Sequence, residues 1–164
     1  MLSAHSDTQP YWGKLQKARE LSKRASESAR SHEQNETAAE WQMNAALREA
    51  EFGYAALARK QTVAVLAAVS NRELQILGAL VLARAGDATR ATRMADHLKK
   101  RFSLDTEINR YWLPSIRAAL EIQKNNPANA VDILQAAAPY ELGNPLPQAE
   151  IGGFLYPVYL RGES

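Results

Sequence analysis

The sequence predicts an all-α protein built from antiparallel helical hairpins, and three observations indicate this fold class. Alanine, leucine, glutamate, glutamine, lysine and arginine dominate almost every stretch of the 164 residues, and runs of β-branched residues are rare. Apolar residues recur at helical spacing, as in the stripe of Ala91, Met94, Ala95, Leu98 and Phe102. Turn sequences interrupt this pattern, and short turns between helices require antiparallel neighbours.

The helical pattern divides into a series of predicted segments. In chain order they cover residues 11–30, 36–52, 54–69, 72–85, 89–102, 106–124, 127–138 and 154–162. The segment 72–85 differs from the others, because apolar residues between Leu74 and Leu82 surround most of its circumference. We therefore expect it to be buried on more than one side.

The breaks between these segments carry turn chemistry. Asn35 precedes the segment 36–52 and is expected to cap its N-terminus. The pairs Phe52-Gly53 and Gly86-Asp87 each contain a glycine, which ends a helix at low cost in a left-handed conformation. Asp87 can then accept amide hydrogen bonds at the next N-terminus. The run Asn125-Asn126-Pro127 serves the same purpose, since Pro127 suits a first helical turn.

Small residues recur at matching points early in the second helix of successive hairpins. These residues are Ala18, Ala58, Ala91 and Ala130, separated by 40, 33 and 39 residues along the chain. A small residue at such a point lets two helices approach closely. Periods of this size, built from paired helices, predict an α-solenoid in which each hairpin covers the apolar face of its neighbour.

The residues around the Gly86-Asp87 turn resemble a tetratricopeptide repeat. The matching positions are small Ala79, bulky Leu82, the turn itself, and then Ala91, Ala95 and Leu98 at the family's spacing. The repeat at 39–71 matches at Ala46, Gly53, Ala58 and Val65, and the repeat at 111–140 matches at Ala118, Ala130 and Ala137, with Asn125-Asn126 in place of Gly-Asp.

This resemblance implies a single repeat domain over residues 1–164, wound as a right-handed superhelix. The expected units are a half-repeat at 11–30, repeats at about 39–71, 72–105 and 111–140, and a truncated repeat start at 154–164.

A narrower resemblance covers the second half of the chain. The stretches 101–143 and 155–164 are similar to the C-terminal repeat region of bacterial, especially acidobacterial, eukaryotic-like serine/threonine protein kinases. In that family the region follows a kinase domain, sometimes with a membrane segment between them. The sequence contains neither, and it ends at Arg161-Gly162-Glu163-Ser164, inside the first helix of a further repeat. We therefore interpret it as a fragment of a longer protein.

Catalytic and ligand-binding motifs are missing from the sequence. It has no cysteine, no glycine-rich phosphate loop, no kinase catalytic loop and no metal-binding histidine spacing. We therefore expect no enzymatic activity, cofactor or metal in this chain, although the parent protein is expected to be a kinase. With a net charge of only +2, nucleic acid is not an expected partner, and the basic clusters at 14–24 and 99–101 are interpreted as solvated helix faces.

The longest nearly apolar run, from Leu74 to Ala83, is too short to span a bilayer, which takes about 20 residues. We expect a cytoplasmic location, or an extracytoplasmic one if the parent carries a membrane segment before the repeats.

The tetratricopeptide resemblance implies a partner-binding groove lined by the first helix of each hairpin. The positions that carry over are Glu40, Met43, Leu47, Ala50 and Glu51, then Glu73, Ile76, Leu80, Ala83 and Arg84, then Trp112, Ser115, Ala119, Ile122 and Gln123. The candidate site residues are Met43, Leu47, Ile76, Leu80, Arg84, Trp112, Ser115, Ile122 and Gln123. Arg84 is the only basic residue in the set, so the groove suits an apolar helix or extended segment rather than an acidic C-terminal peptide. The alternative is that tight winding buries these residues against one another.

Two aromatic segments leave alternatives open. The cluster Tyr111-Trp112-Leu113-Pro114 is expected either to pack in the core, with a kink at Pro114, or to anchor a partner. At the C-terminal end, the apolar residues are expected either to fold back on the third hairpin or to mediate self-association through 154–160. These residues are Phe154, Leu155, Tyr156, Val158, Tyr159 and Leu160.

Two function classes follow from the sequence. The first is a non-catalytic scaffold that recruits a protein or peptide partner for an attached signalling domain. The second is a structural or oligomerisation module that packs on itself or on the parent kinase domain.

Overall fold

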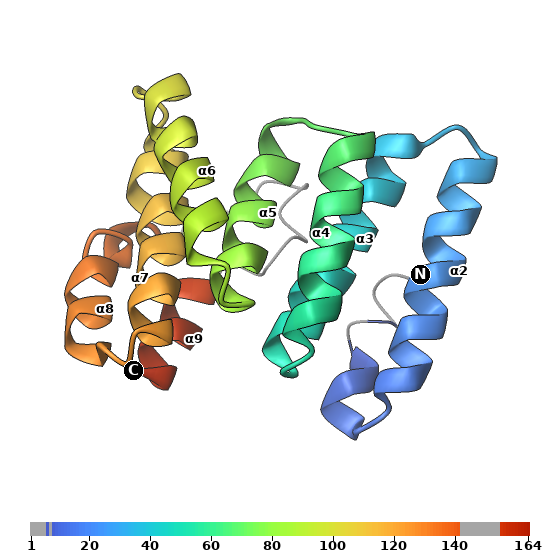
Figure 1. Cartoon of the computed structure of the whole chain (residues 1–164), viewed down its shortest axis with the longest axis horizontal. Coiled ribbons are helices and arrows are strands. Elements are labelled where there is room, and N and C mark those ends of the chain that lie inside the picture. Colours follow the sequence, from blue (N-terminus) through green and yellow to red (C-terminus); the bar gives the residue numbers. More distant parts are fainter. Residues whose placement is uncertain (1–5, 7, 142–154) are drawn as a thin grey trace.

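The computed structural model describes residue 6, residues 8–141 and residues 155–164 (Figure 1). Within this part of the chain every regular element is helical, and the predicted all-α fold class is confirmed. The elements are η1 (Gln9–Trp12), α2 (Leu15–Ser31), α3 (Asn35–Glu51), α4 (Ala55–Ala68), α5 (Arg72–Arg84), α6 (Ala88–Arg101), η2 (Ile108–Trp112), α7 (Leu113–Gln123), α8 (Pro127–Leu134), η3 (Ala138–Tyr140) and α9 (Tyr156–Glu163).

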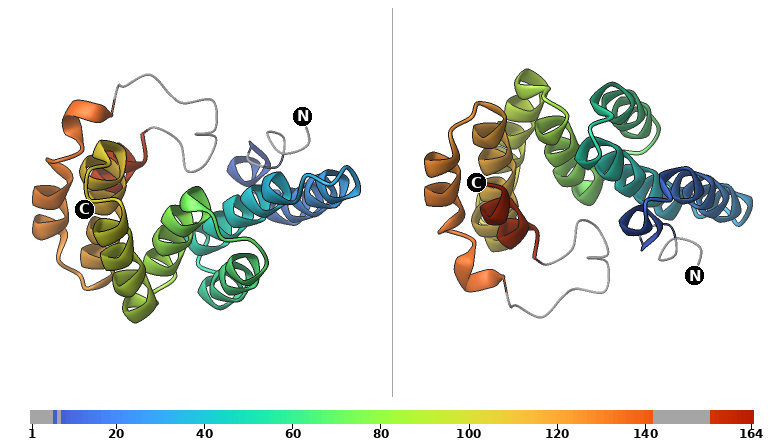
Figure 2. Two further views of the ribbon diagram at one scale, coloured as in Figure 1. Left: turned by 90° about the horizontal axis from the view of Figure 1, so that it is seen from above. Right: turned by 90° about the horizontal axis from the view of Figure 1, so that it is seen from below.

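The helices stand side by side in chain order, each packed against the next from α2 to α8 (Figure 1). A second set of contacts joins α3 to α5, α5 to α7, and α7 to α9. Seen from above and below, the row curves, with α4 on its outer side and α9 on its inner side (Figure 2). The first helices of the hairpins thus form a continuous inner layer.

The four alanines predicted at close helix contacts are all buried. Ala18, Ala58, Ala91 and Ala130 have no exposed surface. Ala58, Ala91 and Ala130 belong to a single apolar core, to which α5 contributes on most of its sides, with every residue from Ile76 to Ala83 buried. The predicted burial of α5 is confirmed. Gly78 contributes to it, because a Cβ there would lie 3.0 Å from Leu66 Cδ1 of α4.

The turn chemistry follows the prediction at three positions. Gly53, Gly86 and Asn125 take positive φ values of 83°, 76° and 59°. The Asp87 side chain accepts the amide hydrogen bond of Arg90 at 3.2 Å and so caps α6. Helices α3, α4, α5 and α6 accordingly begin and end within one residue of the predicted segments.

Prolines and glycines explain where the helices differ from the predicted segments. Gly13, at φ 71°, separates η1 from α2 inside the predicted segment 11–30. The predicted segment 106–124 has the right bounds, since the chain is helical from residue 106 to Gln123, but η2 within it is π-helical just before Pro114, which has no amide to donate to the carbonyl four residues earlier. The segment 127–138 loses its α-helical form after Leu134, where the amides of residues 135–138 bond to carbonyls three residues earlier, and Pro139 has no amide with which to resume the α-helix.

The expected N-cap at Asn35 was also wrong. Asn35 is the first residue of α3, and Gln34 occupies the N-cap position without a side-chain hydrogen bond. Glu33, at φ 61°, completes the turn early and so shifts the start of the helix.

The C-terminal helix α9 folds back onto the third hairpin, where it packs against α7 and α8. Tyr156, Pro157 and Leu160 are buried, whereas Leu155 and Val158 are exposed. Of the two expected arrangements, the structure therefore has the one in which this segment folds back on the third hairpin. Phe154, which belonged to the same expectation, lies outside the described residues.

Replacement of Ala91 by leucine is expected to destabilise the chain by about 1–3 kcal/mol, because overpacking a close helix contact forces strain. The matched control is Ala88→Leu, since Ala88 lies on the same helix and is exposed. Urea denaturation of both variants measures the difference. Equal stability of Ala91→Leu and the parent would contradict the assigned repeat positions.

Replacement of Gly86 by valine is expected to cost about 1–3 kcal/mol, because a β-branched residue resists the left-handed conformation. Gly86→Asn serves as the control, since asparagine tolerates positive φ far better. Thermal unfolding should rank the parent above the asparagine variant and the asparagine variant above the valine variant. A valine variant as stable as the asparagine variant would show that the conformation of this turn does not limit stability.

Candidate partner-binding site

The apolar residues predicted to line a groove lie mainly in the core. Met43, Leu47, Ile76, Leu80 and Trp112 each have at most 8% of their surface exposed and belong to one apolar cluster. Of the remaining candidate residues, Ser115 is buried, Ile122 is half-buried against the cluster, and Gln123 is exposed. The side chains pack against one another, and a role for them in partner binding stays a prediction.

Trp112 and Ser115 have internal partners. The Trp112 indole donates a hydrogen bond to Glu107 at 3.0 Å, and its ring meets the Tyr111 ring edge to face with centroids 4.9 Å apart. The Ser115 hydroxyl donates to the carbonyl of Tyr111 at 2.7 Å. This arrangement corresponds to the core-packing alternative for the aromatic cluster.

The candidate residue Arg84 is the centre of a polar cluster. Its guanidinium donates two hydrogen bonds to the carboxylate of Glu51, at 2.9 and 2.6 Å. It also lies 2.7 Å from the carboxylate of Glu163 in α9. Only 9% of the Arg84 side chain is exposed, so this ion-pair network is largely protected from water.

Two tyrosines of α9 complete this cluster. The Tyr156 hydroxyl donates to Glu51 Oε1, and the Tyr159 hydroxyl lies 2.9 Å from Glu51 Oε2 and 2.6 Å from Glu163 Oε1. The Tyr159 ring centroid is 5.8 Å from the guanidinium carbon of Arg84. We call Glu51, Arg84, Tyr156, Tyr159 and Glu163 the Arg84 cluster; it joins α3, α5 and α9.

The protonation states of the Arg84 cluster are strongly biased. Burial raises the pKa of Tyr156, and the nearby Glu51 carboxylate raises it further. Burial also raises the pKa of Tyr159, aided by its hydrogen bonds to Glu163 and Glu51. For Arg84, burial alone would lower the pKa, but the hydrogen bond to Glu51 contributes to a net rise. Neutral phenols and a charged guanidinium suit binding and orientation rather than proton transfer at neutral pH.

The end of α5 is also held from two other sides. The Gln123 side chain donates to the Arg84 carbonyl at 3.2 Å, and the Arg59 guanidinium donates to the Ala85 carbonyl at 2.5 Å. The structure therefore brings together two predicted site residues, Arg84 and Gln123. It also adds Glu51, which belonged only to the wider set.

The contributions of Tyr156, Tyr159 and Glu163 were missed from the sequence, where the tyrosines were considered only as apolar residues. A usable signal was present, because residues at i, i+3 and i+7 share one face of a helix.

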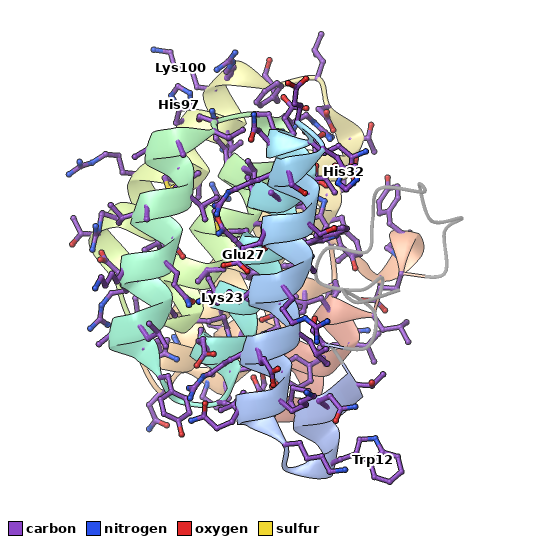
Figure 3. All side chains as sticks on the ribbon, turned by 90° about the vertical axis from the view of Figure 1, so that its right-hand side faces the viewer. Trp12, Lys23, Glu27, His32, His97 and Lys100 are labelled. Carbon is purple, nitrogen blue, oxygen red and sulfur yellow. The ribbon has the colours of Figure 1, made fainter. Side chains whose placement is uncertain are left out.

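Most residues of the two basic clusters are exposed, as predicted, but Arg19 of the first cluster donates to the buried Glu49 carboxylate at 2.8 and 2.6 Å. Lys23 lies 3.9 Å from Glu27 on the surface of α2, and His97 and Lys100 are exposed on α6 (Figure 3). Trp12 is 75% exposed near the start of α2 (Figure 3). Among the described residues, no group of three histidine, cysteine, aspartate or glutamate side chains is arranged to hold a metal ion. In the same part of the chain, no helix combines the length and apolar character that a membrane span requires.

Comparison of the chain with protein-family models, with curated proteins and with solved structures finds no match in any of the three.

Replacement of Glu51 by glutamine is expected to destabilise the chain by about 2–3 kcal/mol, because it leaves the buried Arg84 guanidinium without its bidentate partner. The control is Glu20→Gln, which removes an exposed ion pair with Lys17 and should change stability by less than about 1 kcal/mol. Denaturant unfolding compares both with the parent. A Glu51 variant as stable as the Glu20 variant would contradict the structural importance of the cluster.

Proposed function

We propose that this chain is a non-catalytic protein-interaction module, a tetratricopeptide-like α-solenoid that recruits a protein or peptide partner. The observation that carries the proposal is the inner layer in which α3, α5 and α7 contact one another in sequence. The buried alanines at the predicted repeat positions support the same repeat architecture. In repeat proteins of this kind, the extended inner surface is the usual place for a ligand.

The parent protein that fits this proposal best is a bacterial serine/threonine protein kinase-like signalling protein. This part of the proposal rests on the resemblance of residues 101–143 and 155–164 to the repeat region of that family. The module would bring a substrate or regulator close to the attached domain. A cytoplasmic location is part of the same proposal.

The inner surface suggests where the partner would make contact. The apolar residues of the first helices are packed in the core, so they offer little area to a ligand. The groups that can contact a partner specifically are then the polar side chains at the ends of these helices. The main ones are Arg84, its ion-pair partner Glu51, and the exposed Gln123 beside them. We therefore place the partner contact at the ends of α3, α5 and α7.

A second candidate function is a structural or oligomerisation module. The specific observation in its favour is that α9 of the same chain already lies against the inner layer and bonds to Glu51 and Arg84. On this proposal the chain completes its own surface and needs no separate ligand.

Partner capture and molecular mass together test the proposed function. The unmodified chain, immobilised on a support, should retain a defined protein from a bacterial lysate. The Arg84→Met variant should not retain this protein, although circular dichroism should show that the variant is folded. Arg93→Met is the matched control, since Arg93 is exposed on α6 and should leave capture unchanged. Light scattering after size exclusion should give a monomer.

Two outcomes would contradict the proposal. A defined oligomer that retains no partner would favour the structural module. ATP-dependent phosphotransfer by this chain alone would show that it is catalytic.

A further inference from the structure

Helix α9 makes its apolar and its polar contacts with different parts of the molecule. Its backbone packs against α7 and α8, and Tyr156, Pro157 and Leu160 are buried there. Its polar side chains reach further back along the row, to Glu51 at the end of α3 and Arg84 at the end of α5. Packing onto the third hairpin alone does not require this second set of contacts.

The second set has the chemistry of helix recognition. Tyr156, Tyr159 and Glu163 occupy positions i, i+3 and i+7, so all three side chains project from one face of α9. The Tyr156 phenol donates to the Glu51 carboxylate, the Tyr159 hydroxyl lies within hydrogen-bonding distance of both Glu51 and Glu163, and the Glu163 carboxylate pairs with Arg84. Glu51 and Arg84 thus form a binding site, which we call the Glu51–Arg84 cradle. It is complementary to two phenols and one carboxylate on one face of a helix.

The attachment of α9 is limited in extent. The helix has eight residues, and Leu155, Val158 and Tyr159 along it are between 40% and 55% exposed. A helix this short is not stable by itself in water, so its helical form depends on docking. Beyond the cradle, Arg161 of α9 donates to Glu141 at 2.6 Å, and the Tyr156 backbone hydrogen-bonds to Tyr111. A partner that offers the same groups can compete with α9 for the cradle.

We propose that α9 is an internal ligand of the Glu51–Arg84 cradle, and that the partner of this module carries a helix with two tyrosines and a carboxylate at i, i+3 and i+7 that displaces α9. This inference rests on the proposed function and names the chemistry of the partner. While α9 is docked, the apparent affinity for such a helix is reduced by the fraction of chains whose cradle is open.

Binding of a synthetic peptide with the sequence of residues 155–164 tests the inference. The fluorescein-labelled peptide is titrated into the full chain and into the double variant Tyr159→Phe with Glu163→Gln, which removes polar contacts at partly exposed positions. The variant should bind the peptide roughly tenfold more tightly than the parent, because its own α9 docks less well. A Glu20→Gln chain is the control and should match the parent, and a peptide carrying the same two changes should bind weakly to every chain. Equal affinity of the parent and the double variant would overturn the inference.

Hydrogen exchange on the parent chain provides a second measurement that does not depend on any variant. Excess unlabelled peptide should accelerate exchange of the α9 amides and leave those of α5 unchanged. Unchanged exchange of α9 in the presence of bound peptide would also overturn the inference. If the peptide fails while a cellular partner is still captured, the inference is wrong and the proposed function stands; loss of both contradicts the proposed function as well.

Discussion

The close approach of neighbouring helices at four buried alanines is the constraint on which the rest of the structure depends. Ala18, Ala58, Ala91 and Ala130 have no exposed surface, so there is no room for a larger side chain at these contacts without strain. Helices packed this closely can be joined by short turns. The first helices of successive hairpins therefore run in the same direction, and their C-terminal ends lie along one edge of the row (Figure 1).

This alignment creates the polar cluster. Glu51 and Arg84 are the last residues of α3 and α5, and Gln123 is the last residue of α7. A helix C-terminus carries partial negative charge, which favours Arg84 at that position and disfavours Glu51. Glu51 is compensated by the guanidinium of Arg84 and by the phenols of Tyr156 and Tyr159. The Glu51 carboxylate, although unfavourably placed at a helix C-terminus, thus accepts the hydrogen bonds that hold α9 on the inner side.

The sequence was a good guide to the parts of the fold that depend on local rules. Periodicity and turn residues placed α3, α4, α5 and α6 within one residue, because glycine, asparagine and aspartate at the turns act through the backbone nearby. The π-helical turn before Pro114 was harder to predict from the sequence. A proline indicates where a hydrogen bond is lost but not how the helix adapts to the loss. The site was only partly predictable. Arg84 and Gln123 were named, whereas the contacts of Glu51 and Arg84 with α9 join residues 79 to 108 positions apart and depend on how the row curves.

The chemistry of the cluster also indicates how its occupancy can change. Raised pKa values keep Arg84 charged and the two phenols neutral, so these three groups hold their protonation states near neutral pH. They therefore cannot release α9 by titration under those conditions. Exchange of one helix for another of the same chemistry remains available, because it replaces each hydrogen bond and leaves no buried charge unpaired. Such a cluster is suited to selecting a partner by the side chains that the partner presents. Because α9 already satisfies the same groups, a partner must bind more tightly than α9 does in order to replace it.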